Sequence, residues 1–139
     1  MRQYPALIAL ALVLTSCSWF GGKSKLLAPF SGSEDAVLQK AANAEPAAQL
    51  CGLATSDNLI RLMSKGRAAV VNVGGRVRLL TLTADHGTAG KTYAGDGVEI
   101  SLSFVEDLLD KSGQVIGHKA GAMVRTPSGT EHFYGLWDC

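Results

Sequence analysis

The sequence predicts an α+β fold: short N-terminal helices followed by an antiparallel β-meander or small β-barrel, with one disulfide. Three observations lead to this prediction. Two segments in the first half of the chain carry helix start and stop signals. From residue 67 onward, β-rich runs alternate with glycine-containing turns. One of the three cysteines directly follows an apolar leader, which leaves Cys51 and Cys139 as a pair.

The first residues have the pattern of a signal peptide. Arg2 precedes an apolar run at residues 6–14. Such a run fits an apolar signal core of about 7–15 residues and is too short for a membrane-spanning helix, which needs about 20. The letters LTS at 14–16 then lead directly to Cys17. A branched apolar residue, two small residues and a cysteine in this order resemble the lipobox of bacterial lipoproteins.

The lipoprotein resemblance implies a location. In that family the cysteine thiol receives a diacylglycerol, the signal is cut just before it, and the new amino end is usually acylated, for example with palmitate. We therefore expect a signal peptide at 1–16 and a lipid anchor on Cys17, because two or more fatty chains hold a protein stably on a membrane. Ser18, in place of an aspartate, favours the outer membrane and a domain facing the periplasm. An ordinary secretory signal is the alternative.

The charge balance excludes one class of partner. The chain has 13 Lys and Arg against 12 Asp and Glu, and removal of Arg2 with the signal leaves a net charge of about zero. No basic stripe with interleaved aromatic residues occurs, so we expect no nucleic-acid partner. The expected partners are a membrane, through the lipid anchor, and a protein of the cell envelope.

Cys51 and Cys139 form an even pair in a chain expected to be exported, and such pairs usually form disulfides. The bond would close a long loop, which stabilises a protein by roughly 4 kcal/mol in the chain-entropy model. It would also fix the C-terminal residue, which otherwise frays. Two free thiols are the alternative. Neither cysteine lies in a CxxC motif, so a redox enzyme is not expected.

The chain divides into three parts after this reasoning. Residues 1–16 are the signal peptide. Residues 17–32 are rich in Gly, Ser and Lys, and we expect the lipidated cysteine and a flexible tether there. Residues 33–139 are expected to form a single α+β domain.

Two short helices are predicted at the start of that domain. The segment SEDAVLQKAANA begins at Ser33, and its acids Glu34 and Asp35 lie in the first turn, where they interact favourably with the helix dipole. The segment TSDNLIRLMSKG at 55–66 is predicted as the second helix, ended by Gly66.

The rest of the domain is predicted as five or six antiparallel strands. The pair GG at 74–75 separates two β-rich runs and indicates a hairpin, because both turn positions accept positive φ. Residues 98–106 alternate as in a half-buried strand. Turns at 110–114 and 127–129 separate the last runs, and residues 85–97 are expected to be a polar, glycine-rich loop.

Residues with obvious chemistry are few. His86, His118 and His132 lie in three segments without the spacing of metal ligands, so no metal, cofactor or catalytic residue is predicted. A hydrolase that uses His86 or His132 is the enzymatic alternative, but the sequence offers no nucleophile elbow. The alternation of the last strand places Phe133 and Trp137 on one face and Tyr134 on the other. The rings either fill the core or, as at Tyr134, contact a partner.

Residues 72–102 resemble the membrane-bound inhibitors of c-type lysozyme. In Ala89-Gly90-Lys91-Thr92-Tyr93 the glycine and tyrosine fit that family's SGxxY motif, and Cys139 fits its terminal disulfide. The resemblance implies a small barrel whose 87–97 loop plugs the lysozyme cleft, with Lys91 and Tyr93 as candidate contacts. The chain departs from the family in Ala89, which replaces the serine, in the absence of a Lys-Gly pair after Tyr93, and in the helical segment before the sheet.

Together these features predict a lipid-anchored, non-enzymatic envelope protein that acts as a binding or assembly module. Inhibition of a c-type lysozyme through the 87–97 loop is the alternative function.

The anchor has a direct test. The mature N-terminal peptide is expected to begin at Cys17 and to carry a lipid-sized mass increment on that residue. Mass spectrometry of this peptide measures both. A mature chain with an unmodified Cys17 thiol would contradict the lipoprotein prediction.

Overall fold

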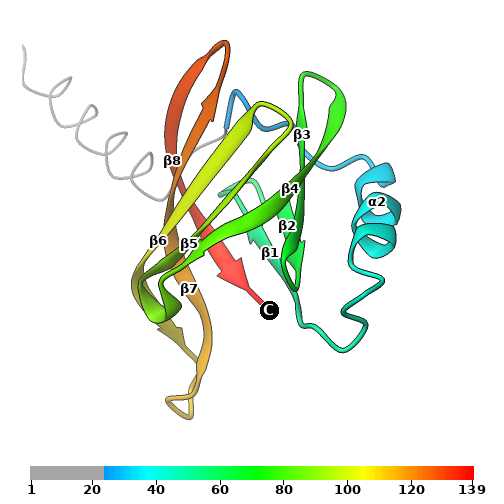
Figure 1. The fold of residues 1–139 in the computed structure, drawn as a ribbon. Coiled ribbons are helices and arrows are strands. Elements are labelled where there is room, and N and C mark those ends of the chain that lie inside the picture. Colours follow the sequence, from blue (N-terminus) through cyan, green and yellow to red (C-terminus); the bar gives the residue numbers. More distant parts are fainter. Residues whose placement is uncertain (1–23) are drawn as a thin grey trace, which may run out of the picture.

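The computed structural model describes residues 24–139, which form a closed barrel of eight antiparallel strands. The strands follow one another around the barrel in chain order, and β8 pairs with β1 to close it (Figure 1). The predicted signal peptide and Cys17 lie outside the described residues.

The elements in chain order are α2 (Ser33–Ala41), β1 (Leu50–Ala54), β2 (Ile60–Lys65), β3 (Ala68–Val73), β4 (Arg76–Asp85), the 3-10 turn η1 (Gly87–Ala89), β5 (Gly90–Gly95), β6 (Val98–Leu109), β7 (Val115–Thr126) and β8 (Gly129–Asp138). The β6 and β7 strands are the longest, so their hairpin projects beyond the others at the end of the barrel that also holds η1 and Cys139 (Figure 1). We call this the lower end.

The barrel interior is the hydrophobic core. Side chains alternate between the two faces of a strand, so every second residue points inward. The inward residues of all eight strands form one packed cluster, which includes Leu53, Leu62, Val71, Leu80, Tyr93, Ile100, Ala122, Phe133 and Trp137. Interior side chains fill the lumen of small eight-stranded barrels in this way.

The fold class is therefore a β-barrel with one short helix, which corrects part of the prediction. The predicted helix at 55–66 is wrong. Thr55 and Asp57 form a turn, in which the Thr55 hydroxyl donates to the Asp57 carboxylate, and β2 follows. Leu62 faces the core and Met63 the outside, as the pairing of β2 with β1 and β3 requires. Tertiary pairing thus overrides a local pattern compatible with a helix.

Two further expectations about the strands change. Residues 85–97 are not one loop, because η1 and strand β5 occupy most of this range. The barrel also has eight strands instead of five or six, since β1 was not anticipated, β2 lies in the predicted helix and β5 lies in the predicted loop. Glycines at 52 in β1 and at 90 and 95 in β5 lower the β propensity of these two segments, so propensity alone does not predict them as strands.

One predicted turn, one strand alternation, two buried rings and the disulfide are confirmed. The Gly74-Gly75 turn, with both residues at positive φ, joins β3 to β4. The 98–104 alternation is observed in β6, and Phe133 and Trp137 are buried in β8. A disulfide joins Cys51 in β1 to Cys139, just after β8.

Residues 24–30 cover the upper end of the barrel and are not a free tether. Leu27 is fully buried in the core and forms a bridge with Val73 at the end of β3. The backbone N–H groups of Lys25 and Leu26 donate to the two carboxylate oxygens of Glu131 in β8, over 2.6 and 3.1 Å. We call residues 24–30 the cap segment.

A buried arginine holds the cap segment from the other side. One terminal nitrogen of Arg61 donates to the Leu27 carbonyl over 2.8 Å, and the other forms a 2.6 Å ion pair with Asp57. Its Nε donates to the Thr55 hydroxyl. Because each arm of this nearly buried cation has an acceptor, its burial does not carry the large cost of an unpaired charge.

Helix α2 covers the outer face of β3. Leu38 is fully buried in the described structure, and Val70 is buried on the strand face opposite the barrel core. Glu34, also fully buried, accepts hydrogen bonds from the Asn72 side-chain amide over 3.0 Å and from the backbone N–H of Gly32 over 2.9 Å. Burial by itself would raise the pKa of Glu34, but the hydrogen bonds that it accepts lower this pKa overall.

Substitution Glu34→Gln is expected to lower the free energy of unfolding at pH 7 by about 1–3 kcal/mol, because a buried, charge-assisted hydrogen-bond network is broken. A folded-state pKa below the ordinary 4.5 means that the carboxylate stabilises the fold above that pH. This stabilisation is lost as the pH falls through the folded-state pKa.

Denaturant unfolding at pH 7 and pH 3 measures both effects. The exposed neighbour provides the control: Asp35→Asn should change stability by less than about 0.5 kcal/mol. Equal losses in the two variants would contradict the role assigned to Glu34.

Candidate functional site

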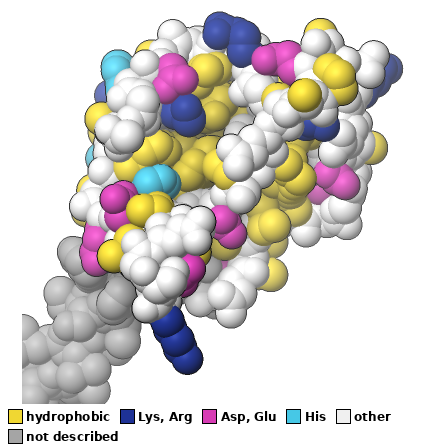
Figure 2. Space-filling model, turned by 90° about the horizontal axis from the view of Figure 1, so that it is seen from below, with side chains coloured by type: hydrophobic (Ala, Val, Ile, Leu, Met, Phe, Trp, Pro, Cys, Tyr) yellow, Lys and Arg dark blue, Asp and Glu magenta, His cyan; other side chains and the backbone are white. Residues whose placement is uncertain are grey.

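The lower end of the barrel contains the candidate binding surfaces. Figure 2 looks at the molecule from this end and shows hydrophobic side chains gathered in a hollow, with polar and charged side chains around it. Two features meet there: the mouth of the barrel, and an apolar groove along the outer face of β1.

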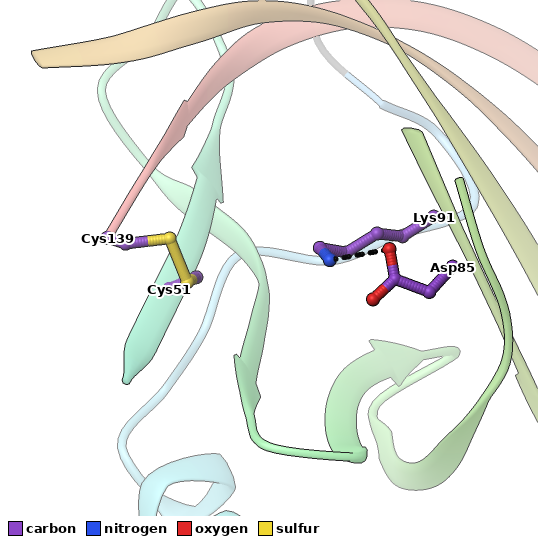
Figure 3. Close-up of a disulfide and its surroundings, with 4 residues drawn as sticks. All are labelled: Cys51, Asp85, Lys91 and Cys139. Carbon is purple, nitrogen blue, oxygen red and sulfur yellow. Dashed lines mark hydrogen bonds and ion pairs between the residues drawn. A yellow bond between two sulfur atoms is a disulfide. The ribbon is translucent and has the colours of Figure 1, made fainter. Parts of the chain in front are cut away.

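The mouth contains an inward-facing ion pair from the β4–β5 corner. Lys91 lies directly opposite the buried Leu102 in the strand register, so its side chain points to the inner face. Its ammonium is 3.1 Å from the Asp85 carboxylate, which also accepts the Gly87 backbone N–H. Figure 3 shows this pair between the barrel walls, with the Cys51–Cys139 disulfide on another part of the wall.

The charge of Asp85 is stabilised by these contacts. Its pKa lies below the ordinary value, first because the Gly87 N–H donates to the carboxylate and second because Lys91 donates to it and attracts it electrostatically. The Lys91 side chain remains about one quarter exposed. The corner therefore presents a cation held in a defined position at the mouth.

Aromatic side chains line the other part of the mouth. Phe104 stacks on the His118 ring with centroids 5.0 Å apart, and it lies 5.9 Å from the Trp137 ring. The His118 Nδ1 is 2.9 Å from an Asp107 carboxylate oxygen. The stacking on Phe104 and the contact with Asp107 thus orient the His118 ring from two sides.

Tyr93, a candidate partner contact from the resemblance, lies in the core. Its side chain is only 1% exposed, and its hydroxyl is hydrogen-bonded to the Ser64 side chain. Burial raises the pKa of the Tyr93 phenol above its ordinary value. At the β4–β5 corner, the Lys91 side chain is partly exposed and the η1 residues are exposed.

The remaining candidates are dispersed. Tyr134 lies half-buried on the outer face of β8, above Gly121, with the Lys119 ammonium 5.8 Å from its ring centroid. His86 is exposed before η1, and His132 is exposed on β8. Tyr134 and His132 lie on β8, whereas Lys91 lies on β5. His86 belongs to the same corner as Lys91, because its backbone N–H donates to the Gly90 carbonyl over 2.9 Å. Among residues 24–139, no group of three or more His, Cys, Asp and Glu is arranged to hold a metal ion.

The groove on the outer face of β1 has a volume of about 500 Å³, within the usual range for small-molecule sites. The register of β1 with β2 and β8 places the outward residues of three strands along it. They are joined by residues from the base of the β6–β7 hairpin. The non-polar lining residues on these elements are Leu50, Gly52, Ala54, Ile60, Met63, Leu108, Ile116, Gly117 and Leu136.

The groove walls are large aliphatic side chains left open to solvent. Leu136 and Ile116 are 51% and 55% exposed, and Leu50 and Ile60 are about two-fifths exposed. Glycines at positions 52 and 117 form part of the floor, so the depth of the groove comes from missing side chains. Contiguous exposed apolar surface of this kind marks binding sites more often than single exposed residues do.

No protein-family model, curated protein or solved structure shows a significant match to this chain. In the part of the chain that the structure describes, no helix is both long and apolar enough to cross a membrane.

The groove was not predicted from the sequence. Its lining comes from β1, β2, β8 and the β6–β7 hairpin, and it exists only because the barrel closes between β1 and β8. One sequence signal was present: in LCGLA the residues of both faces are apolar, so Leu50 and Ala54 have no polar reason to face outward.

Tyr93 is expected to be a core residue instead of a contact residue. Substitution Tyr93→Phe should lower the free energy of unfolding by about 1 kcal/mol, because the Ser64 hydroxyl loses its partner. Tyr93→Ala should cost about 3–5 kcal/mol through the cavity that it leaves. Thermal and denaturant unfolding measure both changes, and an unaltered stability in Tyr93→Ala would refute this placement.

Proposed function

We propose that this chain is a lipid-anchored, non-enzymatic protein of the bacterial cell envelope, on the outer membrane and facing the periplasm, whose barrel is a binding module. The observation that carries the proposal is the aliphatic groove on the outer face of β1, whose lining includes Leu50, Ile60, Ile116 and Leu136, each at least 40% exposed. The lipobox-like LTSC sequence supports the anchor and the location.

The site favours binding over catalysis. The groove has aliphatic walls, and Asp138 contributes a carboxylate to its lining. At the mouth, Lys91 is paired with Asp85 and His118 with Asp107, and both pairs are at least partly exposed to solvent. General acid–base or nucleophilic chemistry requires a nucleophile and a base in mutual reach within one site. The described residues instead offer a shape and an apolar surface.

Site-specific photo-crosslinking in cells tests the binding module. A photoreactive residue at Ile116, in the groove wall, is expected to give a discrete adduct, identified by mass spectrometry. The same residue at Leu79, equally aliphatic and 43% exposed but outside the groove lining, should give none. Equal labelling at both positions would overturn the assignment of the groove.

Inhibition of a c-type lysozyme is the second candidate function, and a specific observation favours it. The resemblance implies a small barrel whose chain end is pinned by a disulfide, and the described residues form such a barrel with Cys51 bonded to Cys139. The β4–β5 corner presents Lys91 at the mouth, where its charge could meet the acidic residues of a partner's cleft.

Lysozyme activity assays test this candidate. The purified chain is expected to inhibit a c-type lysozyme at nanomolar to micromolar concentration, and Lys91→Ala should weaken inhibition at least tenfold. The matched control is Lys65→Ala, a half-buried lysine on β2 that lies outside the β4–β5 corner. Absence of inhibition at high molar excess would remove this function.

A further inference from the structure

We propose that the groove on the outer face of β1 binds an acyl chain of a bilayer phospholipid. The inference rests on the proposed function, because it names the ligand class of the same groove. Four observations carry it: the aliphatic lining, the paired backbone of the floor, the short spacer to Cys17, and the apolar surface that continues to the hairpin tip.

The lining suits a ligand without polar atoms. The groove walls are Leu, Ile and Met side chains, and glycine backbone forms part of the floor. An acyl chain gains roughly 0.8 kcal/mol for each methylene group removed from water. A peptide in the same place would bring backbone N–H and C=O groups that lose water and need new partners.

Along Gly52–Ala54, the floor has no backbone hydrogen bonds left to offer such a peptide. Along Gly52–Ala54, β1 pairs with β2 on one side and with β8 on the other. An added strand needs an unpaired edge. This part of the groove therefore offers an extended peptide no backbone partners, whereas a hydrocarbon chain needs none.

The length of chain between the barrel and Cys17 brings a membrane within reach. Ser24 is held at the upper end by the Glu131 carboxylate, and Cys17 lies seven residues earlier. Seven residues span at most about 25 Å. Leu136, in the groove wall, is five residues from Glu131 along β8, a distance of about 17 Å. A bilayer that holds a lipidated Cys17 is therefore close enough to meet the groove.

The apolar surface continues beyond the groove to the tip of the β6–β7 hairpin. Leu109 is 58% exposed and Val115 is 48% exposed, and both flank the turn next to Ile116. An acyl chain that leaves a bilayer thus meets apolar side chains before it reaches the groove. This continuity favours a bilayer lipid as the source.

Fluorescence quenching of Trp137 provides the experiment, because this buried residue adjoins the groove. The sequence contains two tryptophans, so Trp19→Phe leaves Trp137 as the reporter. The protein is the chain from Ser18 to Cys139, which carries no lipid and retains the cap segment, the whole barrel and the disulfide. The probe is a lysophosphatidylcholine brominated in its acyl chain, used below its critical micelle concentration. Saturable quenching is expected.

Two variants assign the quenching to the groove. At Gly52 a new Cβ would have only ordinary contacts, 3.7 Å from the Leu62 carbonyl oxygen and 4.0 Å from the Met63 side chain, so Gly52→Leu fills the groove without a backbone clash. It should weaken binding at least tenfold. Leu136→Asn should weaken it several-fold, whereas the matched variant Leu79→Asn should leave it unchanged. Circular dichroism confirms that each variant is folded.

The outcomes separate the ligand, its source and the function. No quenching of the wild-type chain, or equal quenching in Gly52→Leu, overturns the proposal. The lipidated protein in vesicles of phosphatidylethanolamine and phosphatidylglycerol with brominated chains should also be quenched. If only the unlipidated chain responds, the protein's own anchor occupies the groove, and the bilayer source is wrong. If no lipid binds but the Ile116 adduct is a protein, the ligand class is wrong while the binding module stands.

Discussion

The closure of the barrel between β1 and β8 is the constraint on which the rest of the structure depends. Only three residue pairs, from Gly52–Asp138 to Ala54–Leu136, form this seam. Leu53 and Trp137 meet there on the core side, and Gly135 permits the close approach, since a Cβ at that position would lie 2.7 Å from the Ala54 carbonyl oxygen. The disulfide reinforces a short ladder at the point where a sheet would otherwise expose two edges.

The same seam produces the groove. Residues on the core side of these strands hold the barrel together, and their neighbours on the outer side leave an aliphatic surface in contact with water. The two faces of this pair of strands thus differ: the inner face packs the core, and the outer face forms the groove. The mouth, with Lys91 and its partner Asp85, depends instead on the β4–β5 corner, so the two surfaces can be altered independently.

Local signals predicted the parts of the fold that they control. The Gly74-Gly75 turn and the alternation in β6 were correctly predicted, because turn chemistry and side-chain period are local properties of the sequence. The disulfide was correctly predicted because the assignment of Cys17 to the lipobox left two cysteines as a pair. The 55–66 segment was predicted wrongly, since its helix-like pattern yields to pairing with β1 and β3. Of the candidate contact residues, Lys91 is partly exposed at the mouth, whereas Tyr93 is buried in the core. The groove was missed because its residues meet only after closure.

The contacts of the cap segment limit the order in which the chain can fold during synthesis. Its anchor Glu131 belongs to the last strand, and so do the closing partners of β1. A chain synthesised from its N-terminus therefore cannot complete the core, bury Leu27 or form the Cys51–Cys139 disulfide until β8 has been made. Contacts between residues so far apart in sequence slow folding. The topology itself keeps a partly synthesised chain open until its last residues emerge.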